Sequence, residues 1–219
     1  SGSRLLEIGC GWGALAERAV ERHDVLYTGI TLSPAQADIA DARLNTVDLS
    51  GRSRIEICDY RDAQGPYDAI ASVEMVEAVG EAYWPAYLDA IARLLRPGGK
   101  AAIQYILIND ALFERYAASS DFIQAYIFPG GCLISESRFR ALAEARGLVW
   151  RDVHRFGGDY AETLRQWRER FDAAVAADQL PSGFDARFVR LWRYYLQYCE
   201  GGFRGGGIDV AQVTLEKTA

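Results

Sequence analysis

A glycine-rich loop near the start of the sequence has the residue types of a ligand-binding turn. The apolar segment Arg4-Leu5-Leu6-Glu7-Ile8 leads into Gly9-Cys10-Gly11-Trp12-Gly13, and a helical pattern follows. Glycines at this place let the backbone turn tightly and approach a ligand at the carboxyl edge of a sheet. The spacing is not that of a P-loop, and Ala14 replaces the third glycine of a dinucleotide-binding loop. The loop therefore predicts a nucleotide-binding site, with a tight structural turn as the alternative.

Two acidic side chains indicate which class of ligand the loop binds. Glu7 stands just before the loop, where a carboxylate beside backbone amides suits a zwitterionic or cationic ligand better than a pyrophosphate. Asp59 lies in the segment Cys58-Asp59-Tyr60-Arg61-Asp62 and could accept a hydrogen bond from an adenine amino group, with an aromatic ring nearby. Together these features predict S-adenosylmethionine (SAM) as the ligand. A simple turn role for Asp59 is the alternative.

These residues need strands that end at one edge of a sheet. The sequence has strand-like segments at 4–8, 25–30, 54–58, 67–73 and 100–108, and helical patterns between them. Such alternation is typical of a parallel, doubly wound α/β sheet. After the second of these segments, Ser33 and Pro34 have the types expected of a helix N-cap and first helical residue. A helix over 84–95 is expected to end at the Arg-Pro-Gly-Gly segment 96–99.

The second half of the chain predicts two further strands and a helical insertion. The segments 148–154 and 208–215 read as strands and bring the expected sheet to seven strands, most of them parallel. Two amphipathic helices between them carry apolar and aromatic residues at helical spacing: Leu164, Trp167, Phe171, Val175, Phe188, Leu191, Trp192 and Tyr195. We therefore expect one domain over 1–219, with helical insertions at about 109–140 and 160–204, the latter before the last strand.

Composition excludes several classes of protein. The 219 residues are 50% hydrophobic and 25% charged, which is typical of a globular protein, and no apolar run is long enough to span a bilayer. A net charge of −6 disfavours a nucleic acid partner. The chain has two histidines and four widely spaced cysteines (Cys10, Cys58, Cys132, Cys199), so we expect neither a metal site nor disulfides, and a cytoplasmic location. No signal peptide is visible. Because the sequence begins almost directly with a strand-like segment, a missing N-terminal segment is expected.

Longer motifs resemble the cyclopropane-fatty-acyl-phospholipid synthase family, which includes the mycolic acid cyclopropane synthases. The matching segments are the glycine loop, Gly29-Ile30-Thr31-Leu32-Ser33 with Gln36, Asp59-Tyr60-Arg61-Asp62, Tyr126-Ile127-Phe128-Pro129-Gly130-Gly131-Cys132-Leu133, Phe156-Gly157-Gly158-Asp159-Tyr160 and Tyr194-Tyr195-Leu196. The likeness covers nearly the whole chain. It implies a class I methyltransferase fold and methyl transfer from SAM to the cis double bond of an unsaturated phospholipid acyl chain.

The resemblance also implies roles for individual residues. Those implied to bind SAM are Gly9, Gly11 and Gly13 at the methionine part, Thr31 and Gln36 at the ribose, and Asp59 and Tyr60 at the adenine. Glu7, Cys10, Trp12 and Leu32 are also expected to bind SAM. A bicarbonate ion is implied beside the reacting carbons, held by Glu77, the backbone of Ile106 and Tyr160. Tyr126 and Phe128 are implied to line the substrate site.

Two positions depart from the family's usual pattern. Gln104 stands where the family has a histidine ligand of bicarbonate, and Ala78 follows Glu77 where histidine is common. Gln104 still offers an amide N–H to an anion. The segments 74–80 and 103–105 are more similar to the branch that includes plant enzymes and actinobacterial fatty-acid methyltransferases. A further bicarbonate ligand, from before the glycine loop, has no counterpart in this sequence.

The implied reaction sets clear chemical demands. Methylation of an alkene leaves a carbocation, so the site must exclude water, stabilise the cation and remove one proton. The rings of Tyr126, Phe128 and Tyr160 could stabilise the cation, with core packing as the alternative. Bicarbonate paired with Glu77 is the expected base, and a solvated place at a helix start is the alternative for Glu77. Proton loss from the added methyl closes a cyclopropane ring, whereas loss from a chain carbon leaves a methyl-branched or methylene product.

The arginines of the two long helices suggest a lipid surface. Arg165, Arg168, Arg170, Arg187, Arg190 and Arg193 lie among aromatic residues. They could face lipid head groups in a peripheral membrane contact, or form a solvated face over a packed core. Two other functions stay open: a methyltransferase of the same fold for a small molecule, and a SAM- or lipid-binding protein with an incomplete catalytic site. The oligomeric state is not predicted.

Overall fold

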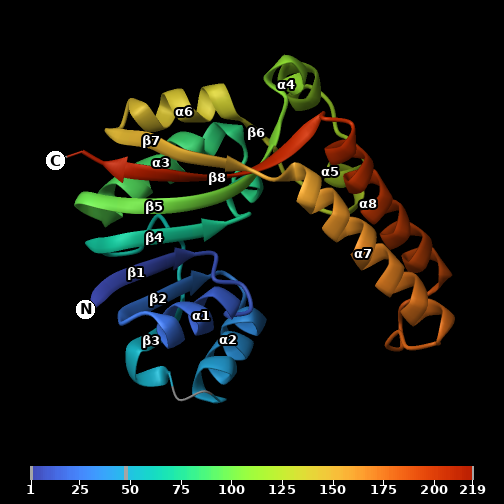
Figure 1. Ribbon diagram of the computed structural model, residues 1–219, viewed down its shortest axis with the longest axis horizontal. Coiled ribbons are helices and arrows are strands. Elements are labelled where there is room, and N and C mark those ends of the chain that lie inside the picture. The colour runs from blue at the N-terminus through green and yellow to red at the C-terminus, as the bar shows by residue number, and fades with distance from the viewer. Residues whose placement is uncertain (1, 47–48, 219) are drawn as a thin grey trace.

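A twisted sheet with helices on both faces forms the body of the molecule (Figure 1). The computed structural model describes residues 2–46 and 49–218. In that part of the chain, seven strands follow the order β3-β2-β1-β4-β5-β8-β7, and the short β6 pairs with β5. Strands β1 to β5 run parallel to one another, whereas β8 runs antiparallel to both β5 and β7. The expected α/β fold with a mostly parallel sheet is confirmed, and β6 adds an eighth strand.

The strands are β1 (Ser3–Ile8), β2 (Val25–Thr31), β3 (Ser53–Ile57), β4 (Tyr67–Val73), β5 (Leu95–Ile108), β6 (Ile134–Ser135), β7 (Leu148–Arg155) and β8 (Ile208–Lys217). The α-helices are α1 (Ala14–Arg22), α2 (Pro34–Thr46), α3 (Trp84–Leu94), α4 (Asp110–Ala117), α5 (Phe122–Tyr126), α6 (Glu136–Glu144), α7 (Gly157–Ala176) and α8 (Ala186–Arg204). Short 3-10 helices occupy η1 (Ser50–Arg52), η2 (Val76–Ala78) and η3 (Glu81–Tyr83).

Two boundaries differ from the sequence prediction. Strand β5 begins at Leu95, because Leu95 pairs with Tyr67 ahead of a register shift in the β4–β5 ladder. The segment expected as one insertion at 109–140 divides into two parts. Helices α4 and α5 lie outside the sheet, whereas Ile134 in β6 pairs with Leu107 in β5 and leads into α6, which packs on the sheet. A two-residue strand carries too short a pattern to be recognised in the sequence.

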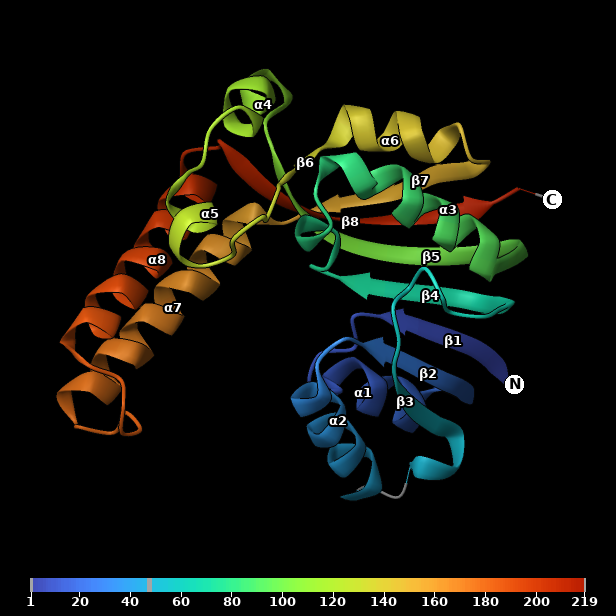
Figure 2. The same cartoon turned by 180° about the vertical axis from the view of Figure 1, so that it is seen from behind.

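Helices α3 and α6 cover the face of the sheet seen in Figure 2, and aromatic rings fill the space beneath them. The Phe139 side chain of α6 is fully buried, with its ring centroid 5.8 Å from that of Trp84, 6.1 Å from that of Tyr105 and 6.2 Å from that of Trp150. Helices α1 and α2 pack on the other face, over β1 to β3. The large core includes residues of β4 and β5. The acidic residues described below follow β4, and their partners Gln104 and Ile106 lie in β5.

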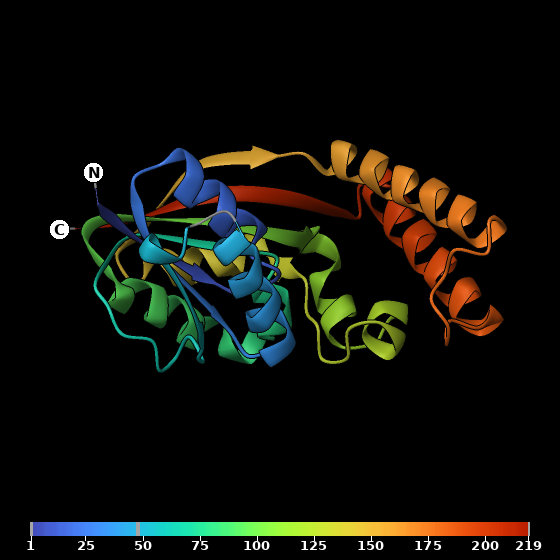
Figure 3. The same cartoon turned by 90° about the horizontal axis from the view of Figure 1, so that it is seen from below.

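Helices α7 and α8 form an antiparallel hairpin that projects beyond the sheet (Figure 3). Only its root is packed against the sheet, where Leu164 and Phe203 join Val210 of β8 in a separate apolar cluster. Ile106 of β5 and Tyr160 of α7 border the same cluster. The root of the hairpin therefore brings Tyr160 next to the end of β5.

The aromatic packing predicts a large effect of a single truncation. Replacing Phe139 with alanine leaves a cavity between α6 and the sheet, so we expect Phe139→Ala to lower the free energy of unfolding by about 3–5 kcal/mol. Chemical denaturation monitored by circular dichroism measures this loss. The matched control is Phe184→Ala, whose ring is 46% exposed in the α7–α8 loop, and its expected cost is below about 1 kcal/mol. Equal losses in the two variants would contradict the described core.

Candidate active site

A cleft of about 690 Å³ opens where β1, β2, β3 and β4 end. Ligands of parallel α/β sheets bind at this edge, because the loops that leave the strands diverge there. The cleft is lined by Ile8, Gly9, Ile30, Thr31, Leu32, Ser33, Gln36, Cys58, Asp59, Tyr60, Arg61, Met75, Ala78, Val79 and Tyr83. Six of the residues expected to bind SAM are thus brought together: Gly9, Thr31, Leu32, Gln36, Asp59 and Tyr60.

Polar groups in the cleft are held in place by local hydrogen bonds. The Thr31 hydroxyl donates to the Gln36 side-chain oxygen at 2.8 Å, and the Gln36 backbone N–H donates to the Ser33 hydroxyl at 3.3 Å, as expected of an N-cap. The Asp59 carboxylate accepts two hydrogen bonds from the Arg61 guanidinium, at 2.9 and 2.7 Å. These bonds lower the pKa of Asp59. The cleft therefore presents a fixed, ionised acceptor beside the Tyr60 ring.

The glycine loop borders the cleft through its first residue. Gly9 has φ +81°, and a Cβ there would lie 2.8 Å from the Met75 Cγ, so only glycine fits. Gly13 has φ +79°, and its Cβ would approach the Ala40 Cβ to 3.0 Å, so it lets α1 pack closely on α2. The other loop residues, Cys10, Gly11 and Trp12, do not line the cleft, and Trp12 is 51% exposed. Their contacts with SAM stay predictions.

Glu7 lies behind the loop and does not line the cleft. Its side chain is 3% exposed, and its carboxylate accepts a hydrogen bond from the Tyr27 hydroxyl on the side of α1 and α2. Burial raises the pKa of Glu7 to about 7. The hydrogen bond between Tyr27 and Glu7 thus links β2 to β1. The expected contact between Glu7 and SAM stays a prediction.

A second set of polar side chains surrounds Glu77, which lies in the segment that follows β4. The Glu77 Oε1 accepts the backbone N–H of Ile106 at 2.5 Å, and its Oε2 is buried without a hydrogen-bond partner among the described residues. Burial raises the pKa of Glu77 to about 7, and the negative charge of Glu74 adds to this rise. The structure therefore brings together Glu77 and Ile106, as the resemblance implied.

Glu74, to which the sequence assigned no role, lies at the centre of this group. Its Oε2 accepts a hydrogen bond from the Tyr160 hydroxyl at 2.8 Å, and its Oε1 accepts one from the Gln104 amide at 2.7 Å. The Gln104 side-chain oxygen in turn accepts from the Gln212 amide at 2.8 Å. A carboxylate at the end of β4, three residues before Glu77, was the available signal. We refer to Glu74, Glu77, Gln104 and Tyr160 as the carboxylate group.

The backbone around Glu74 is fixed in an unusual conformation. Glu74 has φ +50°, a left-handed conformation that side chains other than glycine rarely adopt, and its N–H donates to the Gln104 carbonyl at 2.9 Å. Such strain persists only where surrounding contacts determine it, and it concentrates at functional sites. Two side-chain donors and one backbone bond here hold Glu74 in place.

The aromatic residues expected in the substrate site separate into two places. The Tyr160 ring lies 4.9 Å from that of Phe203, and the Phe128 ring lies 6.3 Å from that of Tyr195. Tyr195 packs against the same apolar cluster as Tyr160 and Ile106, at the root of the hairpin. Tyr126, in contrast, is 63% exposed and packs on Phe122, in a different cluster at the hairpin.

The cleft and the carboxylate group share one wall. Met75, Ala78 and Val79 line the cleft, whereas Glu74 and Glu77 belong to the carboxylate group. The loop at 128–132 closes over the same segment, because the Cys132 N–H donates to the Glu77 carbonyl at 2.8 Å. A methyl donor in the cleft would thus lie beside the segment that carries Glu74 and Glu77.

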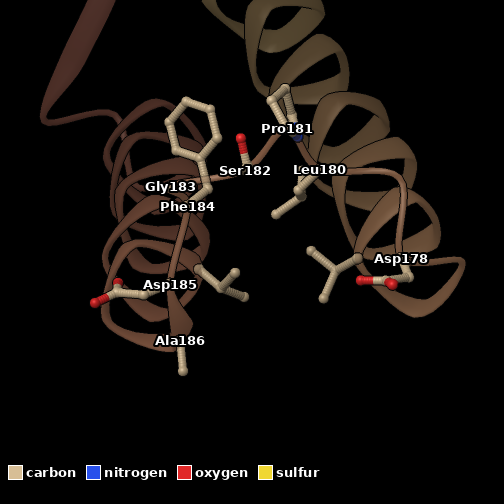
Figure 4. A pocket seen from close by; sticks show the side chains of 10 residues that line it. Asp178, Leu180, Pro181, Ser182, Gly183, Phe184, Asp185 and Ala186 are labelled. Atoms are coloured by element: carbon tan, nitrogen blue, oxygen red, sulfur yellow. The ribbon is translucent and has the colours of Figure 1, made fainter.

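A smaller hollow of about 280 Å³ lies at the tip of the hairpin, between the end of α7 and the start of α8 (Figure 4). Its wall combines Leu180, Pro181 and Phe184 with the carboxylates of Asp178 and Asp185. The Asp185 carboxylate is used structurally, because it accepts a backbone N–H in the first turn of α8. None of the expected site residues lines this hollow, so it is not the candidate active site.

Comparisons with known sequences identify related proteins. A family model described as "Mycolic acid cyclopropane synthetase" matches residues 1–213. Tuberculostearic acid methyltransferase UfaA1 of Mycobacterium tuberculosis is 44% identical over 216 residues, covering 98% of this chain and 50% of that protein. Cyclopropane-fatty-acyl-phospholipid synthase of Escherichia coli is 36% identical over 217 residues, covering 99% and 54%. The chain spans about half the length of these curated relatives.

Solved structures show the same architecture. The crystal structure of mycolic acid cyclopropane synthase CmaA1 complexed with SAH and CTAB is similar with a TM-score of 0.87 and 30% identity, covering 99% of this chain and 78% of that one. The cyclopropane synthase MmaA2 from Mycobacterium tuberculosis gives a TM-score of 0.86 at 26% identity, with the same coverage. These similarities confirm the class I methyltransferase fold expected from the sequence.

The buried Glu77 carboxyl predicts a pH-dependent effect on stability. Its pKa rises from 4.5 to about 7 on folding, so the cost of ionising it in the folded state is absent below about pH 4.5 and complete above about pH 7. Glu77→Gln removes this cost. We therefore expect the free energy of unfolding of the variant, relative to the wild type, to rise by on the order of 2 kcal/mol between about pH 5 and about pH 8.

Urea denaturation at the two pH values measures this difference. Glu21→Gln is the matched control, since Glu21 is exposed on α1 and its substitution is expected to give no such trend. A Glu77→Gln difference that stays constant with pH would show that the carboxyl is not buried as described.

Proposed function

The chain belongs to the mycolic acid cyclopropane synthetase family, and on this premise we propose that the protein is a SAM-dependent methyltransferase of lipids. Its proposed substrate is the cis double bond of an unsaturated acyl chain in a phospholipid, and its product a cyclopropane or a methyl-branched or methylene fatty acid. The observation that carries the proposal is the shared wall at 74–79, which contributes side chains both to the cleft and to the carboxylate group.

The cleft supports SAM as the methyl donor. Asp59 is ionised and offers an acceptor for an adenine amino group, while Thr31 and Gln36 offer polar groups to a ribose one strand away. The positive φ of Gly9 lets the backbone of the loop lie open toward the cleft. SAM supplies an electrophilic methyl group on a sulfonium. The Met75 to Val79 wall would place that methyl beside the carboxylate group.

The side chains in and around the carboxylate group support an alkene as the methyl acceptor. Transfer of a methyl cation to an alkene leaves a carbocation, which aromatic faces stabilise by roughly 0.5–2 kcal/mol each. Tyr160, which bonds to Glu74, and Tyr195 pack at the same apolar cluster and offer such faces, and the Phe128 ring lies 6.3 Å from that of Tyr195. One acid is also needed to take the proton that the cation loses. An amine or hydroxyl acceptor would not require this combination.

Bicarbonate, the base implied by the resemblance, does not fit the donors of this structure. The Tyr160 hydroxyl and the Gln104 amide both donate to Glu74, and the Ile106 N–H donates to Glu77. The implied ligands are therefore engaged by the chain's own carboxylates. A further anion between two acids would add like-charge repulsion in a partly buried site. We derive no step through bicarbonate.

Peripheral contact with a membrane is part of the proposal. Several hairpin arginines pair with carboxylates, as in Arg165–Glu162 and Arg193–Asp172. In the described part of the chain, Arg170, Arg187 and Arg190 form no ion pair, and they would be free to meet anionic head groups. Among the described residues, no helix is both long and apolar enough to cross a membrane. The four free thiols support a cytoplasmic location.

Methyl incorporation tests the proposed function directly. The protein, expressed with its full reading frame, is incubated with methyl-labelled SAM and vesicles of a cis-monounsaturated phospholipid. We expect the released fatty acids to gain one labelled methylene unit by mass spectrometry, and NMR of the product to distinguish a ring from a branch. A fully saturated phospholipid is the control and should gain nothing. No labelled fatty acid from any monounsaturated phospholipid would refute the lipid assignment.

The adenine-binding role of Asp59 has its own test. Asp59→Ala removes the fixed acceptor, so we expect the dissociation constant of SAM to rise by about tenfold or more in isothermal titration calorimetry. Asp62→Ala is the matched control, because Asp62 is an exposed carboxylate in the same loop that does not line the cleft. Unchanged affinity in Asp59→Ala would remove Asp59 from the site.

A further inference from the structure

The carboxylate group contains an acid that the expected mechanism leaves unused. The Glu74 Oε1 and Oε2 each accept one hydrogen bond, from Gln104 at 2.7 Å and from Tyr160 at 2.8 Å. These are the two side chains that correspond to ligands of a free anion in the resembling family. In this chain, a covalently attached carboxylate receives their hydrogen bonds instead.

The two acids, Glu74 and Glu77, differ in their surroundings. The Glu77 Oε2 is buried, and the pKa of this carboxyl is raised to about 7 by burial and by the charge of Glu74. The two carboxylates differ in their hydrogen bonds: the Glu77 Oε2 makes none among the described residues, whereas both oxygens of Glu74 accept one. Glu74 has two donors that stabilise a carboxylate.

Glu74 also lies between the cleft and the root of the hairpin, where we expect the substrate to bind. Its neighbour Met75 lines the cleft, and its partner Tyr160 borders the apolar root of the hairpin with Ile106 and Phe203. Each carboxylate oxygen retains a lone pair after accepting one hydrogen bond. An acyl chain between the cleft and the hairpin root would pass within reach of one of them.

We propose that the Glu74 carboxylate is the general base of the reaction and makes a bound bicarbonate unnecessary; this inference rests on the proposed function. The alkene π electrons form a bond to the transferred methyl carbon, and the electrons of the carbon–sulfur bond stay on sulfur. Glu74 then takes a proton from the cationic product. If the proton comes from the added methyl, the released electron pair closes the ring; if it comes from a chain carbon, the pair forms a double bond.

The proposal requires no other reactant. Glu74 ends the step as a neutral carboxylic acid, and the product is neutral. Glu74 is only partly buried, and Gln212, which bonds to Gln104, is exposed, so the acid returns its proton to water when the product leaves. Tyr160 and Gln104 are positioning residues in this scheme, because they orient Glu74.

Bicarbonate dependence tests the proposal with the full-reading-frame protein. In buffers freed of carbon dioxide, we expect the wild type to methylate monounsaturated phospholipid at a rate that added bicarbonate changes less than about twofold. Glu74→Gln should lower kcat by about a hundredfold or more, with the dissociation constant of SAM unchanged. The matched control is Glu81→Gln, since Glu81 lies on the same segment and pairs with Arg138 outside the site.

A second variant separates catalysis from structure. Glycine adopts the φ of +50° at position 74 without strain, so Glu74→Gly removes the carboxylate while keeping the backbone. We expect this variant to be inactive without bicarbonate, to recover turnover when bicarbonate is added, and to broaden the NMR signal of isotope-labelled bicarbonate, which the wild type leaves unchanged. A purely structural role for Glu74 would produce no such rescue.

Three results would overturn the inference. The first is a wild type that is active only with bicarbonate, and the second is Glu74→Gln retaining more than about a third of wild-type turnover. Either would leave the proposed function intact, because methyl transfer to the lipid is still observed. The third is a wild type that transfers no methyl to phospholipid with or without bicarbonate, which refutes the proposed function and the inference together.

Discussion

The hydrogen bonds from Tyr160 and Gln104 to the Glu74 carboxylate tie together three parts of the molecule that are far apart in sequence. Glu74 ends β4, Gln104 lies within β5, and Tyr160 stands in the first turn of α7. A carboxylate so close to apolar rings is stable only when donors satisfy it. The arrangement of the carboxylate group therefore depends on these bonds, which fix the position of the Glu74 carboxylate.

The sheet makes this arrangement possible. Parallel pairing of β4 with β5 sets Val73 beside Gln104, and the antiparallel β8 sets Gln212 opposite Gln104. The face beneath carries the aromatic core around Phe139, so β5 cannot shift without disturbing that packing. The hairpin root then holds Tyr160 over the same strand. Rigid packing on one face thus positions polar chemistry on the other.

Much of the fold could be predicted from the sequence, because alternating apolar segments and capping residues act locally. The strands at 4–8, 25–30 and 67–73 and the N-cap Ser33 are such cases. The short β6 gave no pattern of its own. In the site, the glycine loop and Asp59 marked the cleft, but Glu74 was missed because its partner Tyr160 lies 86 residues away. No local spacing indicates which donor a carboxylate meets after folding, nor that Glu7 would turn away from the cleft toward Tyr27.

A crystal structure of the protein with S-adenosylhomocysteine and a single-chain alkyl lipid would test the central claim most directly. The account predicts that the lipid chain passes beside the Glu74 carboxylate, at about 3–4 Å from one of its oxygens, with Tyr160 and Gln104 still donating to that carboxylate. It predicts no separate anion among these three residues. A small planar anion held by Tyr160 and Gln104, with Glu74 turned away from the lipid, would contradict it.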